Sequence, residues 1–260
     1  MGQIDHFSHG ALTPGIAFAL SCVGSALSLT CASRAQAVRG AARTRWFVLA
    51  SVALGGTAIW GMHFVGMLGF AVKGTEIRYD VLLTVASLFL AIVVVGVGMA
   101  IAGRPRAGTA GLLLGGVLTG AGVAGMHYVG MAGINMSADI EYSVPVVAAS
   151  IVIAVVAATA ALWAALNVRG PAAFAGASVI MGVAVSGMHY TGMAAISVEG
   201  GGSSQPVHGV AASQFLAPVV TGVSLFTVVT LLIVALSASV DEIREETELD
   251  ARLNRLSEQR

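Results

Sequence analysis

The stretch Gly125-Met126-His127-Tyr128-Val129-Gly130-Met131 ends a long apolar run, and close variants of it, Gly61–Met67 and Gly187–Met193, end two others. The histidines of the three copies, at 63, 127 and 189, are 64 and 62 residues apart. Such regular spacing indicates a unit of about 60 residues that occurs three times. Because every copy ends an apolar run, we expect the three histidines at one depth of a membrane, where ionisable side chains tend to be functional.

The composition is typical of an integral membrane protein. Apolar residues make up 57% of the 260 residues and charged residues only 10%, whereas soluble domains contain about 25% charged residues. The formal net charge is zero and the chain has no cluster of basic residues suited to phosphate backbones, so we expect no nucleic-acid partner. The apolar blocks have the length that crosses a bilayer, about 20 residues. We therefore expect the lipid bilayer to be the first partner of the chain.

Seven apolar blocks divide the chain, each bounded by proline, glycine or charge. They cover about 14–33, 46–70, 81–102, 109–131, 145–167, 172–195 and 215–238. Since backbone groups in lipid must be bonded within their own segment, these blocks predict helices. We predict an all-α integral membrane protein with seven transmembrane helices, arranged as three tandem two-helix repeats and a seventh helix. This membrane domain covers 1–238, and a short charged cytoplasmic tail covers 239–260.

The basic residues indicate the orientation of the chain. Seven arginines lie at or between the ends of alternate spans: Arg34, Arg39, Arg43, Arg45, Arg104, Arg106 and Arg169. The other loops contain only two basic residues, Lys73 and Arg78. Because basic loops stay in the cytoplasm, we predict a multi-pass protein of the cell membrane, the inner membrane in bacteria, with the N-terminus outside and the C-terminus in the cytoplasm. All six histidines, including His6, His9 and His208, then lie on the outer side.

Glycine is unevenly distributed among the spans. The second, fourth and sixth spans contain sixteen glycines and the other four spans contain five. Small residues let membrane helices approach closely. We therefore predict that the second, fourth and sixth spans form a tight inner trio and that the remaining spans face lipid.

The repeated motif supplies nitrogen and sulfur ligands. Each histidine follows one methionine directly and precedes another by four residues, a spacing that places two side chains on one face of a helix. Imidazole binds copper, zinc or iron, and thioether sulfur selects Cu(I). The motif contains no carboxylate, which argues against calcium or magnesium as the ion. We therefore predict a metal site, with copper as its ion. Its nine candidate ligands are Met62, His63, Met67, Met126, His127, Met131, Met188, His189 and Met193.

Other roles for the motif remain open at this point. The histidines could serve only as hydrogen-bonding groups between helices, and methionine commonly fills gaps in apolar packing. Two of the histidines could be axial ligands of a haem. The chain could also be a copper uptake or transfer accessory protein. We expect no enzyme activity, because Asp139, Glu141 and Glu199 lie in loops without a partner pattern.

The stretch Met188-His189-Tyr190-Thr191 spells the signature of the MHYT domain, and the copies around His63 and His127 resemble it with changes. Phe64 replaces the tyrosine in the first copy, and valine replaces the threonine in the first and second. Over essentially its whole length the chain resembles this family of bacterial integral-membrane sensor proteins. The resemblance implies a copper-binding module on the outer side of the membrane that senses a diatomic gas such as oxygen, carbon monoxide or nitric oxide.

In many family members the module is fused to cytoplasmic domains that make or degrade cyclic di-GMP, or to histidine kinases. No such domain follows the seventh span, so we expect a stand-alone member that signals through a cytoplasmic or membrane partner. Leucines at 249, 253 and 256 form a short seam in the tail, which is compatible with a homodimer contact.

Overall fold

A computed structural model describes residues 4–104, 106–199, 207–240, 242, 245 and 249. Seven of its helices are long and apolar enough to cross a membrane, which confirms the predicted fold class. The spans are α1 (Leu12–Ala37), a second span from Gly40 to Met67, α4 (Val81–Ala102), α5 (Gly108–Ala132), α6 (Val144–Asn167), α7 (Pro171–Ala194) and α8 (Ala212–Leu236). Most of the predicted tail, 239–260, lies outside the described residues.

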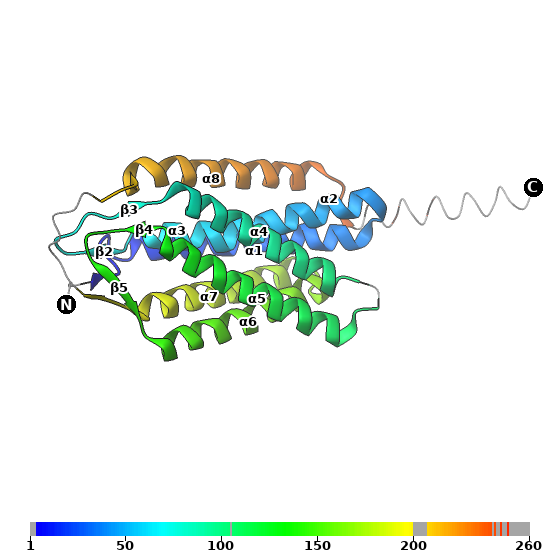
Figure 1. The fold of residues 1–260 in the computed structure, drawn as a ribbon. Helices are drawn as coiled ribbons and strands as arrows, with labels where there is room; N and C mark the ends of the chain where they lie inside the picture. The colour runs from blue at the N-terminus through cyan, green and yellow to red at the C-terminus, as the bar shows by residue number, and fades with distance from the viewer. Residues whose placement is uncertain are drawn as a thin grey trace, which may run out of the picture.

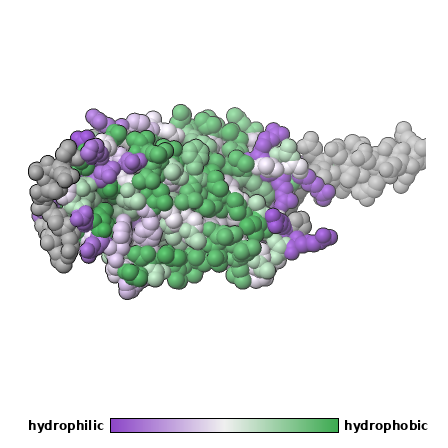
Figure 2. Space-filling view, in the orientation of Figure 1, coloured by the Kyte–Doolittle hydropathy of each residue, from purple (hydrophilic) through white to green (hydrophobic). Residues whose placement is uncertain are grey.

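The helices lie side by side in one bundle (Figure 1). On the face that Figure 2 shows, an apolar belt crosses the middle of the molecule, with hydrophilic residues toward both ends. We call the end that contains the motifs and the short strands the histidine end. The opposite end is the arginine end: the predicted arginines lie in the last turns of α1, between α1 and α2, in α2, and in the loops after α4 and α6.

Each repeat is closed at the histidine end by a pair of short antiparallel strands. The strand before the first helix of the repeat pairs with the strand after its second helix. The pairs are β1 (Ile4–Asp5) with β2 (Ala71–Val72), β3 (Arg78–Tyr79) with β4 (Ile134–Asn135), and β5 (Asp139–Tyr142) with β6 (Ile196–Glu199). These strands are not predicted from the sequence, because two to four residues are too few to show an alternating pattern.

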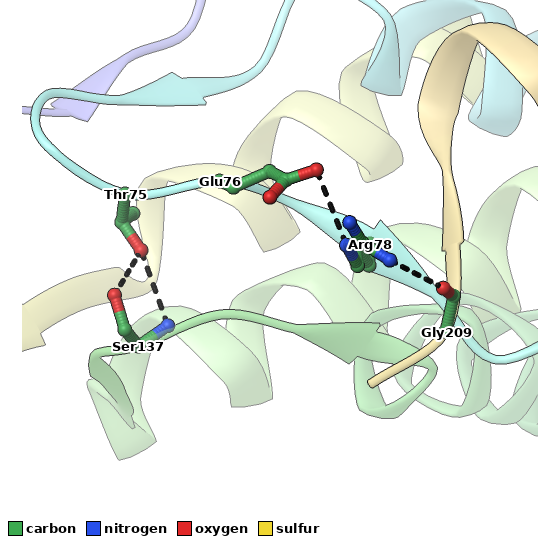
Figure 3. A network of polar contacts seen from close by, with 5 residues as sticks. All are labelled: Thr75, Glu76, Arg78, Ser137 and Gly209. Carbon is green, nitrogen blue, oxygen red and sulfur yellow. Dashed lines mark hydrogen bonds and ion pairs between the residues drawn. The ribbon is translucent and has the colours of Figure 1, made fainter. Parts of the chain in front are cut away.

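Further contacts link the repeats at the histidine end (Figure 3). The strand β7 (Val210–Ala211), which precedes α8, pairs with the other edge of β3. Arg78 forms an ion pair with Glu76 and donates to the carbonyl of Gly209 at 3.2 Å. The hydroxyls of Thr75 and Ser137 lie 2.6 Å apart, so the linker after β2 is bonded to the linker after β4.

Six of the spans pack in a closed order around the molecule, while α8 lies outside it. Along the chain each helix packs against the next, and α7 packs back against α1. The helix α8 contacts mainly the second span and α1 (Figure 1). One hydroxyl contact at 3.2 Å, between Thr57 and Thr227, joins α8 to the second span.

The predicted inner trio of the second, fourth and sixth spans is wrong. In the most apolar window of each span, 83% of the second span and 50% of α1 are buried, but only 28% of α7. The glycines do allow close approach, but to the first helix of the next repeat. A Cβ at Gly55 or Gly120 would come within 3 Å of the backbone of α4 or α6, and one at Gly182 would come within 3 Å of Cys22 in α1. These three seams close the order of helices cyclically.

The second span departs from regular α-helix just before its motif. It consists of α2 (Gly40–Ser51), the π-helix η1 (Val52–Gly61) and the short α3 (Met62–Met67), whereas α5 and α7 are α-helical throughout. A π-helix is rare and occurs frequently at functional sites. The first motif, Gly61–Met67, therefore begins at the last residue of the π-helix.

We expect Gly120→Ala to lower the free energy of unfolding by about 1–3 kcal/mol, because the added methyl group meets the backbone of Val155, which cannot rotate away. The control is Gly176→Ala in α7, where nothing lies within 4 Å of the new Cβ. Thermal unfolding in detergent compares the two variants. Equal melting temperatures for both would show that the glycine seam is not a close contact.

Candidate metal centre

The three motif histidines occupy equivalent places near the ends of three helices. His63 lies in α3, His127 in α5 and His189 in α7, each four or five residues before its helix ends. All three side chains are buried, with at most 1% of their surface exposed. The prediction that they lie together at one depth agrees with this arrangement.

The three imidazoles meet through their Nδ1 atoms. Nδ1 of His63 lies 3.0 Å from Nδ1 of His189 and 3.2 Å from Nδ1 of His127. One ligand nitrogen from each ring lies within 4.8 Å of both others. The rings stand nearly perpendicular to one another, with interplanar angles of 76°, 85° and 81°. We call His63, His127 and His189 the histidine cluster.

The second glycine of each motif makes room for a histidine from another repeat. A Cβ at Gly130 would come within 3 Å of Nε2 of His63, and a Cβ at Gly192 within 3 Å of Nε2 of His127. In the same way Gly66 receives Nε2 of His189. The contacts run from the first repeat to the second, from the second to the third and from the third to the first, so the cluster has pseudo-threefold symmetry. The repeated glycine in the motif therefore has a steric role that the sequence analysis did not assign.

The aromatic residue after each histidine forms an outer layer. Phe64, Tyr128 and Tyr190 each contact the preceding imidazole, with centroids 4.7 to 4.9 Å apart. Tyr128 lies 2.7 Å from the hydroxyl of Ser150 in α6. Phe64 has no hydroxyl group. The counterpart of Ser150 in α4 is Ser87, and Trp60 of η1 donates its indole N–H to the Ser87 hydroxyl at 2.9 Å. The first and second repeats are thus joined by a side-chain hydrogen bond, as the second and third are, although Trp60 lies four residues before the position that Tyr128 occupies in its motif.

The cluster suits a soft cation of low charge. Ligand nitrogens about 2.0–2.1 Å from an ion lie roughly 3.3–3.6 Å apart in trigonal or tetrahedral geometry, so the observed 3.0 and 3.2 Å require only a small expansion. Three neutral imidazoles leave the charge of the ion uncompensated. Because the cost of burying an ion grows with the square of its charge, a divalent ion costs about four times as much as a monovalent one.

Binding through Nδ1 would place the hydrogen of each imidazole on Nε2. Among the described residues, Nε2 of His63 and Nε2 of His127 are buried and have no hydrogen-bond partner, because they face glycines. Metal-binding histidines usually donate the second N–H to an oxygen, which raises their basicity. Without that acceptor the imidazoles are weaker bases, which further favours Cu(I) over Zn²⁺.

A family model described as "Bacterial signalling protein N terminal repeat", MHYT, matches residues 56–115, 120–177 and 182–241. These segments together cover more than half of the chain and contain the three motifs. The chain belongs to the MHYT family. Each family match begins within the second helix of a two-helix unit and continues into the helix that follows. The first two matches therefore include α4 and α6, and the third includes α8, which makes α8 the counterpart of those two helices.

Several bacterial signalling proteins resemble this MHYT chain. The bifunctional diguanylate cyclase/cyclic di-GMP phosphodiesterase MucR of Pseudomonas aeruginosa is 38% identical over 187 residues, which cover 69% of this chain and 27% of MucR. The cyclic di-GMP phosphodiesterase NbdA of the same organism is 37% identical over 54% of this chain and 19% of NbdA. The signaling protein YkoW of Bacillus subtilis is 29% identical over 73% of this chain and 24% of YkoW.

The chain thus spans about a quarter of the length of these curated relatives. No solved structure matches the chain significantly. The relatives therefore place the chain among MHYT signalling proteins, and their named activities belong to proteins that are much longer.

The other predicted ligands take different places. All six motif methionines are buried. Met131 lines an open cavity of about 680 Å³ at the histidine end, together with Tyr128 and Asp139. Met188 lines a small apolar cavity of about 30 Å³ on the other side of the cluster, between η1, α5, α6 and α7. Two of the methionines thus border cavities on opposite sides of the imidazoles.

The remaining histidines lie outside the cluster. His6 stacks against Phe70, with centroids 5.7 Å apart, and burial lowers its pKa, an effect that the nearby Asp5 carboxylate partly opposes. His9 and His208 are exposed. The structure therefore selects three of six histidines as candidate ligands.

We expect Gly192→Ala to displace the His127 imidazole, because the new methyl group occupies the space beside Nε2. Gly187→Ala in the same motif is the control, since nothing lies within 4 Å of its Cβ. Ring nitrogen signals of histidine-labelled protein measure the displacement by NMR. Unchanged His127 signals in Gly192→Ala would contradict the proposed steric role of this glycine.

Proposed function

We propose that the chain is a membrane sensor module that binds one Cu(I) ion through His63, His127 and His189. The observation that carries this proposal is the approach of three buried Nδ1 atoms, 3.0 and 3.2 Å apart, from three repeats. The three neutral imidazoles support a soft ion of low charge such as Cu(I), and the buried methionines of the same motifs supply candidate thioether ligands. The six motif methionines, Met62, Met67, Met126, Met131, Met188 and Met193, remain candidate additional ligands beside the three histidines.

The short distances between imidazoles support copper over haem. Two axial nitrogens of a haem iron stand on opposite faces of the macrocycle, about 4 Å apart, and the macrocycle separates their rings. In this chain the Nδ1 atoms are closer than that and the imidazole centroids are 4.9 to 5.4 Å apart. A transport function has less support, because the cavity beyond the cluster is small and nearly all its lining is apolar.

The proposed signal is a change at the ion. A Cu(I) ion held by the histidine cluster would offer a site for a diatomic gas and could change its oxidation state, and either change would alter the preferred number and arrangement of ligands. Each ligand histidine is seated against a glycine of another repeat, so movement of one imidazole displaces a second helix. The names of MucR and NbdA concern cyclic di-GMP turnover, and we propose that this module likewise delivers its signal to an output domain or partner at the arginine end.

We also propose that the histidine end faces the outside of the cell and the arginine end faces the cytoplasm. The seven arginines at one end and the ion-paired Arg78 at the other support this orientation.

The combined replacement of His63, His127 and His189 by glutamine is expected to abolish binding of Cu(I), because it removes all three imidazole donors. Metal analysis of the purified protein after anaerobic loading measures the copper content per chain. Carbon monoxide added to the loaded protein is expected to give a copper carbonyl band in the infrared spectrum, and this band is lost with the cluster.

The matched control replaces the same number of histidines outside the cluster, His6, His9 and His208, by glutamine. This control is expected to keep its copper. Undiminished copper in the cluster variant would refute the proposed site, and loss of copper from both variants would assign the metal to the outer histidines instead.

The orientation is testable by labelling single cysteines in a background with Cys22→Ala and Cys31→Ala. We expect a membrane-impermeant maleimide to label His208→Cys in intact cells, because this residue is exposed at the histidine end, and to label Arg106→Cys only after lysis. The reverse pattern would overturn the proposed orientation while leaving the metal proposal intact.

A further inference from the structure

A second polar cavity lies at the arginine end, far from the histidine cluster. It has a volume of about 530 Å³ and opens between α1, the turn from α6 to α7, and the segment after α8. Its lining includes Arg34, Arg169, the turn residue Gly170, and Ser239. We call it the arginine pocket.

Arg34 is an unusual residue in this pocket, because its charge is buried and it forms no ion pair with any of the described residues. Only 7% of its surface is exposed. Its guanidinium stacks over Trp46 at 5.0 Å and donates from Nη2 to the carbonyl of Ser237 at 3.4 Å. Nη1 is buried and has no hydrogen-bond partner, and no carboxylate of the described residues forms an ion pair with Arg34. A buried cation in this state needs an anion.

Two further features of the pocket are electropositive. Arg169 is held in place by donating to Gln36 and to the carbonyls of Leu166 and Val168. The helix α7 begins at the pocket, after Gly170 with a φ of 87°. The first N–H groups of a helix attract anions. Two guanidinium groups and a helix N-terminus thus line one cavity.

We propose that the arginine pocket binds a phosphate group, supplied either by the headgroup of an anionic lipid or by a soluble phosphate compound. Guanidinium groups match phosphate oxygens through paired N–H donors, and Nη1 of Arg34 is a donor still in need of an acceptor. The pocket lies beside the ends of α1 and α6 and the start of α7, at the level where membrane spans end and lipid headgroups lie. This site goes beyond the proposed copper centre and does not depend on it.

The bound phosphate would lie beside the start of the C-terminal segment. Ser239 and Glu242 form reciprocal hydrogen bonds: the Ser239 N–H donates to the Glu242 carboxylate at 2.6 Å, and the Glu242 N–H donates to the Ser239 hydroxyl at 3.2 Å. Such a capping box begins a helix. Hydrogen bonds from Ser239, and then the charge of Arg34, lower the pKa of Glu242. The exposed Glu242 carboxylate therefore competes with a phosphate for Arg34.

Trp46 provides the measurement, because its indole lies under the Arg34 guanidinium. The full chain is placed in nanodiscs of phosphatidylcholine and titrated with inorganic phosphate, and is compared with nanodiscs that contain phosphatidylglycerol. We expect a change in tryptophan emission that is absent from Trp46→Phe. A response to phosphatidylglycerol alone identifies a lipid headgroup as the source, and a response to added phosphate identifies a soluble compound.

Arg34→Gln and Arg169→Gln are each expected to weaken the response about tenfold or more, because each removes charge-assisted hydrogen bonds. Arg104→Gln is the matched control, since it removes one cation from the same end but does not line the pocket. Glu242→Gln is expected to strengthen binding by removing the competing carboxylate, and its exposed position leaves the fold intact. If Arg34→Gln does not fold, Glu242→Gln and Arg169→Gln still test the proposal, because one is expected to strengthen the response and the other to weaken it.

Absence of any emission change with either phosphate source would overturn the proposal. It would also be overturned if Arg104→Gln weakened the response as strongly as Arg34→Gln, because the effect would then be one of general surface charge. Both readouts use protein without copper, so the outcome is independent of the metal proposal.

Discussion

The contact between an imidazole and a glycine of another repeat is the constraint on which this molecule depends. Three helices can bring bulky side chains to one buried point only if the facing backbone has no Cβ, and the motif supplies that glycine three residues after each histidine. The same contact occurs three times in cyclic order, so closing one pair of repeats orients the next. The glycine seams nearer the middle of the bundle follow the same cyclic order.

The threefold pattern is interrupted mainly in the first repeat. Its second helix contains the π-helix η1, its motif has Phe64 in place of tyrosine, and Trp60 supplies the hydrogen bond to Ser87 that a tyrosine hydroxyl supplies elsewhere. The same helix is covered by α8 and is the most buried of the seven. The first repeat therefore differs from the other two in backbone geometry and in surroundings. A change in the histidine cluster would act on one helix that is unlike the two others.

The two ends of the molecule have different chemistry, and α1 belongs to both. At the histidine end the cluster contains neutral donors in an apolar setting. At the arginine end the buried cation Arg34 lies beside the C-terminal segment and forms no ion pair with any of the described residues. The helix α1 carries Arg34 and packs against η1, α3 and α7. A rigid helix that contacts two of the three ligand-bearing spans is a physical connection between the proposed metal centre and the proposed phosphate pocket.

The sequence by itself determined the seven membrane helices, their threefold repetition and the common depth of His63, His127 and His189, because hydrophobic length and residue spacing are local properties. It did not determine which helices are neighbours. Glycine content identified the close contacts but not their partners, so the inner trio was wrong, and strands as short as β1 and β2 left no pattern. Tertiary structure brings the Nδ1 atoms together, places a glycine beside each Nε2 and buries Arg34 in its pocket. Each of these features joins residues from different repeats or distant segments, so no local pattern could show it.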